Sequence, residues 1–130
     1  MLKSFADLHI HIGSSLDGKP VKITAAKAMT LPQVIKTARD VKGLSLIGII
    51  DSQSPGVQQD FLTLEESGLI KPLAGGGYDA LGLTVLCGTE VELTLGTGSA
   101  HLLAYFPDIA HLQKYREKLE PYIKNWQLSS

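Results

Sequence analysis

The sequence predicts an α/β fold with mostly parallel strands, and three observations support this prediction. Residues 4–12 alternate between apolar and polar side chains, as in a half-buried strand. Residues 44–51 form a short continuous apolar run, which suits a strand buried on both faces of a parallel sheet. The expected elements follow one another as strand, helix, strand, helix, strand, strand and helix.

The expected first strand, over residues 4–12, has two different faces, because successive side chains on a strand point to opposite sides. One face is apolar and consists of Ala6, Leu8, Ile10 and Ile12. The other face carries Phe5, Asp7, His9 and His11. A polar loop with the sequence GSSLDGKP follows.

A helix is expected over residues 30–43, TLPQVIKTARDVKG. Thr30 is a suitable N-cap, Gln33 completes a capping box, and Gly43 ends the helix. The expected apolar stripe consists of Leu31, Val34, Ala38 and Val41. The strand over residues 44–51 comes next and ends at Asp51.

The second half of the chain is expected to hold two helices and two strands. Val57, Phe61 and Leu64 mark a helix that stops near Gly68. The glycine-rich segment AGGGYDALG, residues 74–82, is expected to be a flexible loop. Strands are expected over residues 83–93 and 99–106. The last helix, over residues 108–123, has Asp108 as its N-cap and an apolar stripe of Ile109, Leu112, Tyr115 and Leu119.

Composition places the chain among soluble globular proteins. Its 130 residues suffice for one domain, with 44% hydrophobic and 19% charged residues. A net charge of -1 argues against binding nucleic acid mainly through electrostatics. The single cysteine, Cys87, fits a reducing cytosol, and no secretory signal or membrane-length apolar run is present. We therefore expect a cytoplasmic protein with no membrane partner.

His9 and His11 are the first candidates for chemistry. Two residues apart on a strand, they share a face, and their rings are able to converge on one cation. The alternative is a pair of hydrogen-bonded histidines at a strand end. The position before a glycine loop, at the carboxyl end of a strand, favours a metal site.

Three further residues lie at strand positions where α/β proteins place their sites. Asp51 ends the second strand, although it is equally suited to capping the following turn. Glu90 is a candidate ligand, whereas together with Glu92 it would also suit a solvated strand face. His101 opens an apolar strand and alone would be a core histidine, but the joint pattern makes it a candidate ligand.

The ordered set of these segments resembles the polymerase and histidinol phosphatase (PHP) family of metal-dependent phosphoesterases. DLHIHIGSS is similar to the family's first motif, GIIDSQSP stands where the second lies, and GTEVEL and AHLLAYF match the next two. The stretch GKPVKITAAKAMTLPQVIKTARDVKGLSLIGIID, the triple glycine and the ending NWQLSS resemble the N-terminal part of endonuclease Q and its bacterial relatives.

The resemblance implies a distorted (β/α)7 barrel that holds zinc or manganese ions. It implies metal ligands at His9, His11, Glu90 and His101, with Glu90 bridging two ions. Many members carry further histidines where this chain has Ser52 and, approximately, Asp17. We therefore expect two ions, with Asp51 and Asp17 as additional ligands or as residues that hold ligands in place.

The resemblance also implies a function. Endonuclease Q cleaves the DNA backbone 5′ of deaminated bases such as uracil and hypoxanthine, and at abasic sites, so DNA would be the partner of the complete protein. The family's later motifs, a further histidine and an Asp-x-His pair, are absent from the 130 residues. The chain is therefore expected to be one domain, residues 1–130, forming an incomplete N-terminal part of the barrel. Whether it is an enzyme alone stays open.

Two alternatives remain. One is a phosphatase of the same superfamily that acts on small phosphate monoesters. The other is a non-catalytic or truncated module that forms homo-oligomers through an exposed sheet edge.

Overall fold

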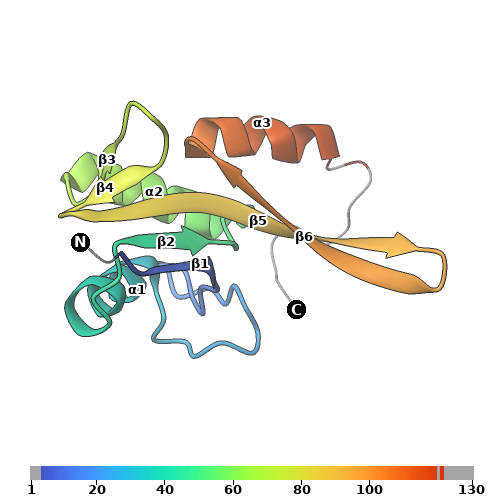
Figure 1. The fold of residues 1–130 in the computed structure, drawn as a ribbon, viewed down its shortest axis with the longest axis horizontal. Coiled ribbons are helices and arrows are strands. Elements are labelled where there is room, and N and C mark those ends of the chain that lie inside the picture. The colour runs from blue at the N-terminus through green and yellow to red at the C-terminus, as the bar shows by residue number, and fades with distance from the viewer. Residues whose placement is uncertain (1–3, 120, 122–130) are drawn as a thin grey trace.

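The computed structural model describes residues 4–119 and residue 121. Its strands are β1 (Ala6–Ile10), β2 (Leu46–Ile49), β3 (Lys71–Pro72), β4 (Tyr78–Ala80), β5 (Leu83–Leu95) and β6 (Gly98–Phe106). Its helices are α1 (Leu31–Lys36), the π-helix η1 (Thr37–Val41), α2 (Pro55–Ser67) and α3 (Ile109–Leu119). Figure 1 shows these elements, with the long β5–β6 hairpin extending beyond the end of β2.

The strands form one mixed sheet in the order β1-β2-β5-β4-β3, with β6 also paired to β5. β1, β2 and β5 run parallel to one another, whereas the β3–β4, β4–β5 and β5–β6 pairs are antiparallel. The prediction of mostly parallel strands is therefore wrong beyond the first three strands. Short turns join the later strands, and only antiparallel strands allow such turns. In the part of the chain that the structure describes, the sheet is open, with β1, β3 and β6 as its edge strands.

A β-bulge interrupts the pairing of β1 with β2. Asp7 lies opposite Ile47 and Ile10 lies opposite Ile49, so β1 has one residue more than β2 between these pairs. Such an insertion changes which face the following side chains occupy. Simple alternation predicted that Asp7 shares a face with His9 and His11 and that Ile10 lies on the other face. The observed register instead places Asp7 opposite Ile47 and Ile10 opposite Ile49, two residues on the same face of β2.

The hydrophobic core lies on one face of the sheet. It takes alternate residues of the central strands, among them Ile47, Ile49, Val85 and Cys87. The three α-helices contribute to the same cluster through Leu31, Val34, Ile35, Val57, Phe61, Leu64, Ile109 and Leu112. Because strand side chains alternate, Gly48, Gly88 and Glu90 belong to the opposite face of the sheet.

The glycine-rich segment 74–82 is not the flexible loop that its composition predicted. It includes β4, which pairs with both β3 and β5. Tyr78 is 2% exposed, packs against Phe61 and accepts a hydrogen bond from the backbone N–H of Ile109. Burial of this ring holds the segment in the sheet and raises the pKa of Tyr78 to about 12.

The first helix differs from its prediction at its second half. Residues 37–41 form a π-helix, whose wider turn shifts the helical phase. Val41 consequently leaves the predicted apolar stripe and is 78% exposed, whereas Leu31, Val34 and Ala38 are buried. Thr30 makes no side-chain cap hydrogen bond.

The other two helices agree with their predicted patterns over the described residues. Residues 120, 122 and 123, at the predicted end of the last helix, lie outside that part of the chain. Val57, Phe61 and Leu64 are buried on α2, and Gly68 ends that helix in the left-handed region with φ 83°. Asp108 caps α3 by accepting a hydrogen bond from the backbone N–H of His111 at 2.9 Å. Across the described residues, none of the helices has the length and apolar character needed to cross a membrane.

Candidate metal centre

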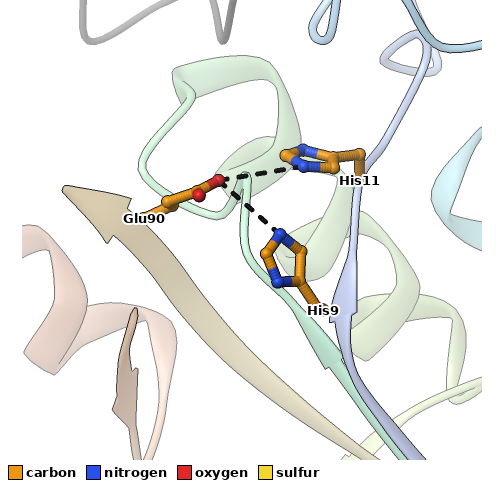
Figure 2. Close-up of side chains that lie close together, drawn as sticks. All are labelled: His9, His11 and Glu90. Carbon is orange, nitrogen blue, oxygen red and sulfur yellow. Dashed lines mark ion pairs between the residues drawn. The ribbon is translucent and has the colours of Figure 1, made fainter. Parts of the chain in front are cut away.

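His9 and His11 converge with Glu90 beside the carboxyl end of β1. The Nε2 atoms of both histidines lie 3.8 Å from Oε2 of Glu90. One potential ligand atom from each of the three residues falls within 4.8 Å of the other two. Figure 2 shows the two imidazoles facing the carboxylate of Glu90, which comes from β5. Two imidazole nitrogens and a carboxylate oxygen are a ligand set suited to Zn²⁺ and related ions.

The parallel pairing of the strands produces this convergence. β1, β2 and β5 are adjacent and point in the same direction, so segments about 80 residues apart in the sequence end at one edge. Glu90 lies on β5 just beyond its last pair with β2, Ile49–Cys87. The side chain of His9 is 52% exposed and that of Glu90 is 18% exposed, so solvent reaches the space between them.

His101 completes the surroundings of Glu90 from the β6 side. Its Nδ1 lies 2.6 Å from Oε1 of Glu90, while the other carboxylate oxygen faces His9 and His11. The hairpin register pairs His101 with Glu92, which places His101 diagonally across from Glu90 on the same face. His101 is exposed, so it is not a core histidine.

Asp51 contacts Nδ1 of His11, the ring nitrogen that does not face Glu90. Its carboxylate oxygens lie 3.1 and 3.2 Å from Nδ1 of His11, and Oδ2 accepts a 2.8 Å hydrogen bond from the backbone N–H of Ile12. Asp51 is 1% exposed. Because a carboxylate accepts hydrogen bonds, the Nδ1–H of His11 donates to Asp51, and Nε2 is the ring nitrogen that faces Glu90.

The electrostatics of the cluster favour a charged carboxylate. Burial raises the pKa of Glu90, but the hydrogen bond with His101 and the nearby His9, His101 and His11 together bring that pKa below its usual value. The same hydrogen bond to Glu90 raises the pKa of His101. Glu90 is therefore ionised at neutral pH, which is the state that binds a cation.

Asp17 is not brought into this cluster. It binds within its own loop, to the hydroxyl of Ser15 and the backbone N–H of Lys19, and it lines a separate hollow with Ser54 at the start of α2. Ser52 also points elsewhere. It is fully buried, donates a 2.7 Å hydrogen bond to the carbonyl of Ile49 and accepts one from the backbone N–H of Gly88. A histidine would not fit there without disrupting these contacts.

Tyr105 also lies beside the cluster, and the sequence pattern did not predict it as a site residue. The hydroxyl of Tyr105 donates a hydrogen bond to the carbonyl of Leu8, immediately before His9. Gly48 and Gly88 were the available signal, because glycine inside a strand often marks close approach of another group.

No family model matches the chain. Its fold and sequence are nevertheless similar to part of endonuclease Q. The crystal structure of the lesion-specific endonuclease from Pyrococcus furiosus aligns with 94% of this chain, with a TM-score of 0.69 and 28% identity. Endonuclease Q in complex with a 27-mer duplex that holds an abasic lesion at its active site aligns equally far, with a TM-score of 0.68 and 28% identity.

A curated relative, the uncharacterised protein YqxK of Bacillus subtilis, is 42% identical to this chain over 135 residues. The chain spans 34% of the length of that relative, and 26% and 27% of the two endonuclease structures. The similarity therefore covers nearly all of this chain but only about a quarter to a third of each longer protein.

Proposed function

We propose that this chain forms part of a PHP-type phosphoesterase barrel and binds divalent metal ions for phosphodiester hydrolysis. The observation that supports this proposal is the convergence of His9 and His11, at the carboxyl end of β1, with Glu90 of the parallel strand β5. The proposed cofactor is zinc or manganese, with two ions and Glu90 between them. The proposed location is the cytoplasm.

The chain's own residues have distinct tasks in this proposal. His9 and His11 supply neutral imidazole nitrogens, Glu90 supplies a carboxylate, and His101 serves as a further ligand on the opposite side of Glu90. Asp51 fixes the tautomer of His11 and is not itself a ligand. Bound divalent ions would polarise a phosphodiester and lower the pKa of a bound water.

The proposed substrate is DNA that contains a deaminated base or an abasic site, as for endonuclease Q. The similarity to a lesion-specific endonuclease that aligns with 94% of this chain supports it. The net charge of -1 indicates that residues outside this chain supply most of the electrostatic attraction to DNA.

Metal content and cleavage test the proposal together. The protein is purified without chelator or histidine tag, and zinc and manganese are measured by elemental analysis beside the His9→Ala/His11→Ala double variant. His111→Ala is the matched control, because His111 is an exposed histidine on α3 that contacts Asp108 instead. We expect one or two ions per chain, lost in the double variant and retained in the control.

The cleavage assay compares end-labelled duplexes that carry an abasic site, a uracil or no lesion, with an aryl phosphate beside them. We expect metal-dependent nicking of the damaged duplexes, which Glu90→Gln reduces more than Glu92→Gln does. Hydrolysis of the aryl phosphate alone would favour the monoester phosphatase. Bound metal without turnover would favour a non-catalytic module, and a folded sample without metal would overturn the metal proposal.

Self-association is the remaining part of the proposal. β1 pairs only with β2 among the described strands, and Phe5 and Leu8 beside this edge are 59% and 39% exposed. An unpaired edge with apolar neighbours is suited to pairing with another chain. Light scattering across a concentration series measures the oligomeric state, and Leu8→Lys is expected to weaken any dimer.

A further inference from the structure

Tyr105 of β6 reaches across the sheet to β1. Its hydroxyl donates a hydrogen bond to the carbonyl oxygen of Leu8, although β5 and β2 lie between the two strands. In a flat sheet, strands are about 4.8 Å apart, so β6 and β1 would be about 14 Å apart. The sheet is therefore curved, and Tyr105 spans its concave face, which also carries Glu90.

Two glycines make room for the tyrosine ring. A Cβ atom on Gly48 would lie 2.7 Å from Cε1 of Tyr105, and one on Gly88 would lie 2.8 Å from its Cδ1. Neither glycine has a positive φ angle, so the backbone conformation does not require glycine at these positions. Glycine is required because the ring of Tyr105 leaves no space for a Cβ atom, and Cβ contacts under 3.0 Å are essentially never seen in proteins.

The hydrogen bond ends inside the β-bulge of β1. The regular pairing with β2 stops at Asp7 and resumes at Ile10, and Leu8 lies between them. His9 follows Leu8 directly, and the bulge determines the face on which His9 and His11 lie. A group that fixes the Leu8 carbonyl thereby fixes the peptide that leads into His9.

We propose that Tyr105 is a positioning residue for the histidine pair. Its hydroxyl holds the bulge in the form that directs His9 and His11 toward Glu90, and its ring keeps β1 and β6 at a fixed separation. The inference rests on the proposed metal function for its effect on ion affinity, but the effect on the histidines themselves is independent of any ion.

Tyr105→Phe tests this role, because it removes the hydroxyl and keeps the ring over Gly48 and Gly88. Tyr115→Phe is the matched control, since Tyr115 lies on α3 and packs against Phe106. NMR of the imidazole nitrogens is recorded in the metal-free chain, and Co²⁺ is then titrated while its visible absorption is followed. We expect Tyr105→Phe to shift the ring signals of His9 and His11, weaken Co²⁺ binding about tenfold and alter the Co²⁺ spectrum.

The control is expected to change none of these readouts. Gly88→Ala provides a second test, because its Cβ would displace the ring from the β5 side, where its nearest contacts are Tyr105 and Ala104 and not Leu8, while the hydroxyl is retained. It should shift the same histidine signals. Ring signals in Tyr105→Phe that match the unmodified chain would overturn the inference. If the unmodified chain binds no Co²⁺, the proposed metal function fails, and the signals of the metal-free proteins still decide the role of Tyr105.

Discussion

Substitution of Asp51 separates its two contacts. In Asp51→Ala, the buried N–H of Ile12 loses its 2.8 Å acceptor and His11 loses its partner at Nδ1. A hydrogen bond to a charged group contributes about 1.5–3 kcal/mol, so we expect the free energy of unfolding to fall by about 2–3 kcal/mol.

Asp51→Asn should behave differently. Its amide oxygen still accepts from Ile12, so the expected loss of stability is about 1 kcal/mol or less. The amide NH₂ then takes the place of Oδ1, 3.2 Å from Nδ1 of His11, while the amide oxygen stays 3.1 Å from it. The ring loses one of its two acceptors and the negative charge that favours a proton on Nδ1, so the tautomer with the proton on Nε2 gains population. Since a protonated Nε2 does not bind a metal, we expect ion affinity to fall about 10–100-fold.

Urea unfolding followed by circular dichroism in EDTA gives the stability of both variants, and competition titration with Zn²⁺ gives the affinity. The double substitution His9→Ala/His11→Ala provides the baseline for loss of the site. Asp51→Asn with the affinity of the unmodified chain would refute the tautomer argument. Equal stability of Asp51→Ala and Asp51→Asn would refute the importance of the bond to Ile12.

Three other substitutions test the packing and charge of the fold. Gly13→Ala would place a Cβ 1.8 Å from the carbonyl oxygen of Ala26, and we expect a loss of about 3 kcal/mol or more in urea unfolding. Phe61→Ala empties a site that is 1% exposed, and it should lower the free energy of unfolding by about 3–5 kcal/mol, measured in the same way. Burial raises the pKa of Asp60, although the hydrogen bond from the backbone N–H of Leu16 lowers it. The protonated carboxyl is therefore favoured in the folded state. The contribution of Asp60 to stability is full below the unfolded-state pKa and is lost as pH rises through the folded-state pKa. Relative to Asp60→Asn, the unmodified chain should therefore gain stability as pH falls from 7 to 4 in a series of unfolding curves, and parallel curves would contradict this.

Local patterns in the sequence predicted the elements that depend on local chemistry. The apolar stripe of α2, the Asp108 cap of α3 and the buried strand β2 all follow from side-chain spacing and are confirmed. The convergence of His9, His11 and Glu90 also follows, because parallel strands bring their carboxyl ends to one edge.

The features that were missed depend on contacts distant in the sequence or on irregular backbone. The bulge in β1 breaks the simple alternation between Asp7 and Ile10, and periodicity carries no signal for one inserted residue. The π-helical turn shifts the helical phase, and Val41 leaves the predicted apolar stripe. Tyr78 turns a glycine-rich segment into a strand because its ring finds a buried site against Phe61, which composition does not reveal.

The hydrogen bond from Tyr105 to Leu8 joins residues 97 positions apart, and this separation has a consequence for the order of folding. The β5–β6 hairpin closes through a short turn at Gly96 and is able to form within about 1–10 μs. The pairing of β1 with β2 and of β2 with β5 requires closure of much longer loops, which is slower. During synthesis, His9 and His11 leave the ribosome long before Glu90 and Tyr105. The two histidines therefore have no contact with the Glu90 carboxylate until most of the 130 residues have been made. We therefore expect the cluster to form late in folding, and metal supplied at the start of refolding to leave the rate of the early steps unchanged.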